Sequence, residues 1–164
     1  MIYNNLMNVN KDLRFMNIAY SQAKKAEKRD EVPVGCVIVK DGRVISKGYN
    51  LKETRKNPMM HAEIVAITKA CRKLKRWRLS DCDIYVTLEP CVMCMGAIIS
   101  ARINRLVFGA YDPKAGACGS LYDLNEGLLN HTLEVKSEVM QEECSNILKE
   151  YFVSKRKAKK IEKS

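Results

Sequence analysis

The sequence contains no segment that is typical of a membrane span or of secretion. No stretch approaches the ~20 apolar residues that a membrane-spanning helix needs. Asparagines interrupt the apolar residues near its start, at positions 4, 5, 8 and 10, and no internal repeat or low-complexity linker is present. We therefore expect a cytoplasmic protein without membrane association.

The cysteine pattern does not suggest a disulfide framework. The chain has seven cysteines, an odd number, at positions 36, 71, 82, 91, 94, 118 and 144. Without a secretory segment, these thiols are expected to stay reduced. A chain of 164 residues that is 46% hydrophobic can bury a core without disulfides. Its length suits a single domain over residues 1–164.

Acidic residues are scarce relative to basic ones. The chain has 29 Lys and Arg against 19 Asp and Glu, which gives a net charge of +10. This excess suits a polyanionic partner such as nucleic acid, although it also serves solubility. Basic residues gather near residues 72–78 and in a tail from about residue 154 to 164. The tail is equally well interpreted as a solvated helix end, where cations complement the helix dipole.

Apolar periodicity predicts alternating strands and helices. Strands are expected over residues 34–39, 44–50, 83–88, 105–109 and 132–136, and helices over about 12–29, 61–74, 90–101 and 138–157. An Asp41-Gly42 turn joins the first two strands into a hairpin, and residues 52–60 and 113–119 are expected to be loops. This order indicates a layered α/β fold.

Two short motifs carry the clearest chemistry, His61-Ala62-Glu63 and Pro90-Cys91-Val92-Met93-Cys94. They supply three zinc ligands, His61, Cys91 and Cys94. A zinc ion with only three protein ligands keeps one coordination position for water, as catalytic zinc does. Glu63 is not needed as a ligand and can move protons for a hydrolytic reaction.

The predicted position of these motifs supports metal binding. Both stand where a helix begins, and a helix N-terminus favours thiolate over thiol at Cys91 and Cys94. Glu63 is two residues beyond His61, so it does not share the direction of His61 on a regular helix. From the first turn its side chain could still reach over the open coordination position.

Two other interpretations of the motif stay open on spacing alone. A single C-x-x-C at the start of a helix is also a redox arrangement, similar to that of thioredoxins. A structural zinc site is the second alternative, and it normally needs four protein ligands. Cys82 or Cys118 could supply a fourth thiolate, whereas His131 has no paired ligand beside it.

The surroundings of the motif resemble those of the bacterial tRNA-specific adenosine deaminases. H-x-E followed by P-C-x-x-C is the signature of zinc nucleobase deaminases. Further matching segments extend the likeness from about Phe15 to Phe152. They are Val32-Pro33-Val34-Gly35, Gly48-Tyr49-Asn50, His61-Ala62-Glu63-Ile64, residues 87–98 (TLEPCVMCMGAI), residues 105–110 (RLVFGA), residues 112–116 (DPKAG) and Gly119-Ser120-Leu121.

The resemblance implies a three-layer α/β/α cytidine-deaminase-like fold with a five-stranded mixed sheet. It implies hydrolytic conversion of the wobble adenosine of a tRNA anticodon to inosine, with release of ammonia. One Zn²⁺ per subunit, a homodimer and binding of the tRNA anticodon stem-loop are implied as well. Glu63 would carry protons to N1 of the base and then to the departing amine.

The resemblance also implies substrate contacts at four residues. Asn50 would hydrogen-bond the base and Val34 would wall the pocket, while Asp112 and Lys114 would lie against the nucleotide backbone. Each position has an ordinary structural interpretation. Asn50 could end a strand, Asp112 could belong to a turn, and Val34 could be core.

Some positions depart from the family pattern. Met95 and Cys118 stand where small residues such as alanine are expected. Tyr111 stands where polar or charged residues are frequent, and Tyr111 and Phe152 are candidates to stack on a base. Deaminases of guanine, free cytidine or pterin- and riboflavin-related compounds share the motif, so they remain rival functions. A zinc-stabilised RNA-binding module without activity is another.

Overall fold

The computed structural model describes residues 2–127 and 129–162, with side chains from residue 9 onward. The helices are α1 (Ile2–Glu27), α2 (Lys52–Arg55), α3 (Ala62–Leu74), α4 (Val92–Ser100) and α5 (Gln141–Ile161). The strands are β1 (Gly35–Lys40), β2 (Arg43–Tyr49), β3 (Asp83–Leu88), β4 (Arg105–Ala110) and β5 (Glu134–Lys136). Strands and helices alternate through the central part of the chain.

The strands form one mixed sheet in the order β2-β1-β3-β4-β5. Strand β1 pairs antiparallel with β2 and with β3, whereas β3 pairs parallel with β4 and β4 with β5. Asp41 and Gly42 link β1 to β2 with positive φ values of 49° and 69°, the backbone that a tight hairpin turn requires. Helix α4 is the crossover that parallel pairing of β3 and β4 needs.

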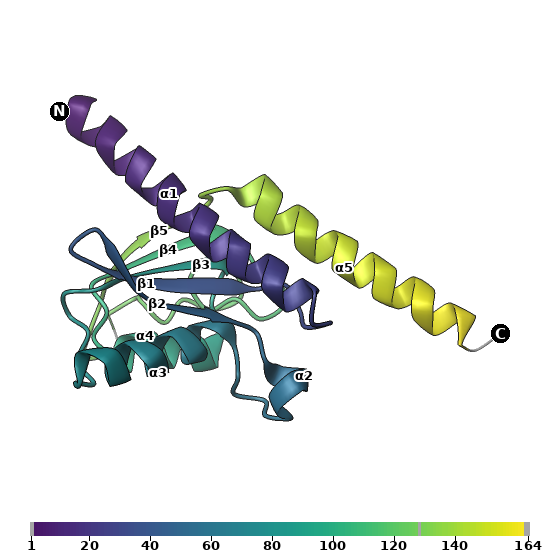
Figure 1. The fold of residues 1–164 in the computed structure, drawn as a ribbon. Coiled ribbons are helices and arrows are strands. Elements are labelled where there is room, and N and C mark those ends of the chain that lie inside the picture. Colours follow the sequence, from purple (N-terminus) through teal and green to yellow (C-terminus); the bar gives the residue numbers. More distant parts are fainter. Residues whose placement is uncertain (1, 128, 163–164) are drawn as a thin grey trace.

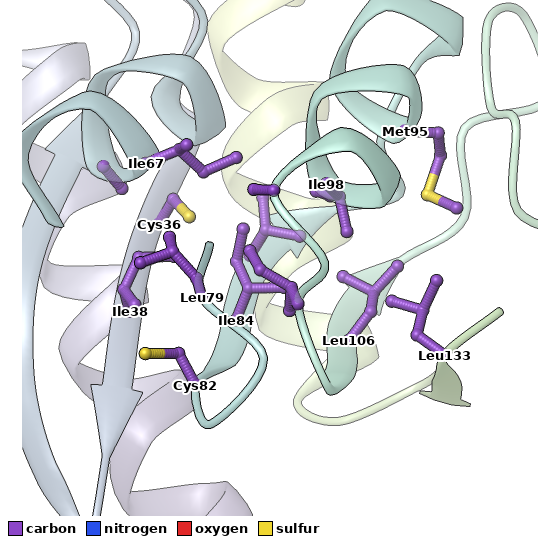
Figure 2. Packing of buried hydrophobic residues seen from close by; sticks show 14 of the residues in the cluster. Cys36, Ile38, Ile67, Leu79, Cys82, Ile84, Met95, Ile98, Leu106 and Leu133 are labelled. Atoms are coloured by element: carbon purple, nitrogen blue, oxygen red, sulfur yellow. The ribbon is translucent and has the colours of Figure 1, made fainter. Parts of the chain in front are cut away.

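Helices cover both faces of the sheet, α1 and α5 on one side and α3 and α4 on the other (Figure 1). The alternation of strand side chains produces the two cores. Cys36 and Ile38 of β1 join the core under α3 and α4, while Val37 and Val39 join the core under α1. Figure 2 shows residues of the core under α3 and α4, among them Cys36 and Ile38.

Two glycines bring the helices close to the sheet. A Cβ at Gly35 of β1 would overlap the Ala19 carbonyl of α1, and a Cβ at Gly48 of β2 would overlap the Ala62 carbonyl at the start of α3. Both positions therefore need glycine for close packing. The contact at Gly48 places the first turn of α3 directly against the sheet.

The expected three-layer α/β/α class with a five-stranded mixed sheet is confirmed. The strand expected at 83–88 coincides with β3, and the hairpin forms where it was predicted. The first helix begins at Ile2 instead of residue 12, although the asparagines of this stretch have low helix propensity.

Three other expectations about local structure are wrong. The expected loop at 52–60 contains helix α2. The closing helix begins at Gln141 instead of residue 138, because Glu138 and Met140 adopt positive φ values of 65° and 59° that interrupt a right-handed helix. Pro90 lies outside α4, one residue before its N-cap Cys91.

In the part of the chain that the structure describes, no helix combines the length and apolar character that a membrane crossing demands.

Candidate metal centre and active site

Helices α3 and α4 bring the two motifs together at their N-terminal ends. His61 is the N-cap of α3 and Cys91 is the N-cap of α4, both with extended backbone, and Cys94 lies in the first turn of α4. The His61 Nδ1 atom lies 3.7 Å from the Cys91 Sγ and 3.6 Å from the Cys94 Sγ. One nitrogen and two sulfurs therefore converge on one point.

The donor set fits a zinc ion. In the described part of the chain, His61, Cys91 and Cys94 form the group whose donor atoms lie within 4.8 Å of one another. Neither Cys82 nor Cys118 belongs to that group. Thiolate and imidazole are donors that zinc prefers, and three protein ligands match a catalytic site better than a structural one.

The charges at the site favour metal binding. The pKa of the Cys91 thiol is lowered to about 4, because the Cys94 thiol donates a hydrogen bond to its sulfur and the His61 imidazole lies beside it. The pKa of Cys94 is raised, because its proton is held by Cys91 and its side chain is buried. Of the two thiols, that of Cys91 is therefore the stronger acid.

Glu63 lies beside the donor group without belonging to it. Its side chain is buried, and this burial is the main cause that raises the pKa of its carboxyl to about 7. A carboxyl group with a pKa near the working pH can both accept and return a proton. The geometry therefore provides an acid–base group next to a three-ligand metal site.

The metal-ligating group opens into an inner cavity of about 200 Å³. Glu63, His61 and Cys91 form part of its wall. The remaining lining residues are Val32, Val34, Asn50, Lys52, Ala62, Leu88, Glu89, Asp112 and Ala115.

A larger outer groove of about 680 Å³ adjoins the inner cavity. The two share Val32, Leu88 and Asp112 as lining residues, so they are continuous along this wall. Helix α5 forms the far side of the groove through Ser145, Leu148, Lys149, Phe152, Val153 and Arg156.

Three of the four predicted substrate-contact residues border the inner cavity. These are Val34, Asn50 and Asp112, whereas Lys114 lines only the outer groove. Asp112 also has the structural role in a turn that its sequence context suggests. The Asp112 Oδ1 accepts hydrogen bonds from the backbone N–H groups of Lys114 and Ala115, which is a local turn.

The other residues named in the sequence analysis lie in the outer groove, in the core or away from the metal donors. Tyr111 and Phe152 line the outer groove and are 41% and 43% exposed, so both can contact a ligand. Met95 is part of the core, and Cys118 is buried with its thiol pKa raised to about 12 by burial. The His131 Nε2 hydrogen-bonds the Ile103 carbonyl at 2.8 Å, apart from the metal-ligating group.

Sequence reasoning did not single out two residues of the inner wall, Lys52 and Glu89. Glu89 had a visible signal, because a carboxylate directly after the buried run of β3 is unusual. Lys52 had none, since it stands in a segment that resembles a polar loop. Its position depends on α2, which the sequence pattern did not predict.

Comparison with known proteins agrees with this geometry. A family model described as the cytidine and deoxycytidylate deaminase zinc-binding region matches residues 9–110. The tRNA-specific adenosine deaminase of Bacillus subtilis (strain 168) is 46% identical over 150 residues, which covers 91% of this chain and 93% of that protein. The similarity therefore extends well beyond the metal-ligating motifs.

Solved structures show the same relationship. One comes from a study of A-to-I editing by tRNA:A34 deaminases at the wobble position of transfer RNA, with a TM-score of 0.79 and 44% identity over 82% of this chain and 99% of the other. A guanine deaminase from Bacillus subtilis matches with a TM-score of 0.59 and 38% identity, over 65% and 69%. The chain belongs to the tRNA-specific adenosine deaminases, within the zinc-binding cytidine and deoxycytidylate deaminase family.

Proposed function

We propose that this chain is a zinc-dependent hydrolase that converts the wobble adenosine of a tRNA anticodon to inosine and releases ammonia. The observation that carries the proposal is the placement of Glu63 beside the His61, Cys91 and Cys94 donors at the inner cavity. Family membership with the tRNA-specific adenosine deaminases supports the choice of substrate.

His61, Cys91 and Cys94 are the proposed ligands of one Zn²⁺ per subunit. Zinc bound there would lower the pKa of a water molecule toward ~7. His61 and Cys91 are the N-cap residues of α3 and α4, so these two helices would position the donors around the metal.

Glu63 is the proposed catalytic acid and base. Water adds at C6 of adenine and the exocyclic amine leaves as ammonia, so protons must move from the water to the N1 atom and to the departing nitrogen. The carboxylate of Glu63 lies at the cavity wall next to the metal donors, where it can carry these protons in turn.

The inner cavity suits a single base that has left its stack. At about 200 Å³ it does not admit a paired stem, so the nucleotide must be turned out of the RNA. An anticodon loop lowers the cost of this step, because its bases are not paired. Asn50 is the proposed hydrogen-bonding partner of the base, and Val34 supplies an apolar wall.

The outer groove suits the RNA on either side of the reacting nucleotide. Tyr111 and Phe152 offer exposed rings for base stacking, and Lys114, Lys149 and Arg156 offer positive charge for phosphates. Asp112 stands where groove and cavity meet, so it is the proposed contact to the backbone of the turned-out nucleotide.

We also propose a homodimer in the cytoplasm. Val92, Leu121 and Tyr122 are large apolar side chains that are 49%, 52% and 56% exposed. Backbone contacts hold the segments of these residues together near the metal donors. Cys91 pairs with Gly116 in a β-bridge, and the Gly116 carbonyl accepts hydrogen bonds from the N–H groups of Leu121 and Tyr122. Such exposed apolar residues fit a subunit interface. Analytical ultracentrifugation would measure the assembly state.

The rival substrate is a free base or small heterocycle, as in the structurally similar guanine deaminase. The purified protein should be incubated separately with an anticodon stem-loop that carries adenosine at the wobble position, and with free adenine, guanine and cytidine. We expect inosine in the RNA and little turnover of the free compounds. Turnover of a free base with none on RNA would overturn the proposed substrate.

A further inference from the structure

Glu89 is a buried carboxylate that is fully engaged by one loop. It is 1% exposed and precedes Pro90 and Cys91. Its two oxygens accept hydrogen bonds from the backbone N–H groups of Asp112 at 2.9 Å, of Cys118 at 3.0 Å and of Ser120 at 3.0 Å. The Ser120 hydroxyl donates a further hydrogen bond to the same carboxylate.

The loop that supplies these donors, residues 112–120, lines both the inner cavity and the outer groove with its first four residues. Asp112 borders both, Ala115 borders the cavity, and Pro113 and Lys114 border the groove. The loop contains no helix or strand that would hold its shape. Glu89 anchors the loop at both ends, near residue 112 and near residues 118–120.

The same loop is packed against the segment that carries a metal donor. The backbones of Cys91 and Gly116 pair in an isolated antiparallel β-bridge. Beside it, the Ala117 N–H donates to the Pro90 carbonyl at 2.9 Å. The approach is so close that a Cβ at Gly116 would overlap the Glu89 carboxylate. Metal donor, glutamate and substrate-facing loop therefore form one packed unit.

We propose that Glu89 is a positioning residue for substrate binding, which holds the 112–120 loop in the shape that receives the RNA. The inference rests on the proposed function for the nature of the substrate. Glu89 does not act on the reacting atoms, because its acceptor positions are occupied by loop donors and it lies outside the metal-ligating group of the described chain.

The first test measures the loop directly. In Glu89→Gln one oxygen becomes an amide nitrogen, which donates and so opposes the loop N–H groups that face it. Residue-resolved hydrogen exchange should show the amides of Asp112, Cys118 and Ser120 exchanging about tenfold faster than in the wild type. This readout needs no substrate and no metal.

The second test separates substrate binding from chemistry. For Glu89→Gln we expect the KM for the anticodon stem-loop to rise about tenfold while kcat stays within about threefold, because the loop contributes to binding before and during the reaction. Zinc content should stay at one per chain. Gly116→Ala disturbs the same contact from the loop side, so it should raise the KM in the same way.

Asp12→Asn is the matched control. Asp12 is also a 1% exposed carboxylate, but it lies under the opposite face of the sheet with Arg105, Lys136 and Tyr85 as partners. This variant should lose stability and keep the wild-type KM and loop exchange. All variants are compared at a temperature at which circular dichroism shows them folded.

Three results would overturn the proposal. Wild-type exchange and KM in Glu89→Gln would show that the carboxylate is dispensable, above all if Gly116→Ala alters both. Loss of zinc from Glu89→Gln would show that the residue acts through the metal donors instead. A KM change of equal size in Asp12→Asn would show a general effect of stability. A protein that deaminates only free bases would refute the proposed substrate, while the exchange experiment would still test the role of Glu89.

Discussion

Glu63 and Glu89 border the same inner cavity, and both are buried, yet their surroundings differ. Glu89 has three backbone N–H donors and a hydroxyl from the 112–120 loop. Glu63 has its own backbone N–H as a donor, and burial raises the pKa of its carboxyl to about 7. Loop donors occupy the acceptor positions of Glu89, whereas Glu63 keeps a carboxyl group that can exchange a proton.

Burial by itself therefore does not identify a catalytic carboxylate. A buried charge must either find hydrogen-bond donors or move its pKa toward the neutral form. Donors that saturate a carboxylate make it an anchor, whereas sparse donors leave it available for chemistry. The number and origin of the donors therefore separate the two roles.

Removal of zinc should give the largest effect. Dialysis against a chelator is expected to reduce deamination to background, and added zinc should restore it, because the metal activates the attacking water. The exchange protection of the Asp112, Cys118 and Ser120 amides should persist, since their acceptor is the protein itself. Activity that survives chelation and depends on a Cys91–Cys94 disulfide would instead support the redox interpretation.

The Glu63→Gln substitution should give the second-largest loss of deaminase activity. We expect kcat to fall by about 100- to 10,000-fold, because general acid–base assistance is worth that much, with zinc content and unfolding midpoint close to the wild type. Deamination kinetics with the stem-loop, metal analysis and thermal unfolding measure the three quantities. Unchanged turnover would remove Glu63 from the mechanism, and it would favour an RNA-binding module in which zinc is structural.

Deletion of residues 154–164 should have a moderate effect. Part of this tail lies in α5, whose Arg156 lines the outer groove, so we expect roughly tenfold weaker RNA binding at low salt and a shallower salt dependence. Binding measured over a range of salt concentrations tests this. A variant with Lys157→Gln and Lys159→Gln keeps the helix length and isolates the charge. An identical salt slope would mean that the tail is a solvated helix end.

Asp12→Asn should leave turnover unchanged and alter stability. Burial would raise the pKa of Asp12, but hydrogen bonds from Arg105, Lys136 and Tyr85 outweigh it and lower the pKa to about 2. A depressed pKa stabilises the fold above the unfolded value, and this contribution disappears as the pH falls from about 4 toward 2.

At pH 7 the Asp12→Asn variant should lose about 3–5 kcal/mol of unfolding free energy, because Arg105 loses its buried ion-pair partner and keeps only the exposed Glu134. Its stability should also change less than that of the wild type between pH 4 and pH 2. Urea unfolding at several pH values measures both effects. Equal pH dependence in the two proteins would contradict the role assigned to the Asp12 pairs.

The sequence predicted those parts of the fold that depend on neighbouring residues. Alternating β-branched residues located β3, and Asp41-Gly42 located the hairpin, since strand and turn preferences are local. Helix α2 was not predicted, because two N–H groups of its first turn, those of Glu53 and Thr54, donate to the carboxylate of Glu31, which lies 22 and 23 residues away. Such distant capping leaves no pattern in the segment itself.

His61, Cys91, Cys94 and Glu63 were identifiable from the sequence, because each motif fits within a single helical turn and its spacing sets the ligand geometry. Only the tertiary structure separates the proposed role of Glu63 in proton transfer from the proposed role of Glu89 in holding the loop. The donors to Glu89 come from residues 23, 29 and 31 positions away. Only the folded chain brings them together and leaves Glu63 free to exchange a proton.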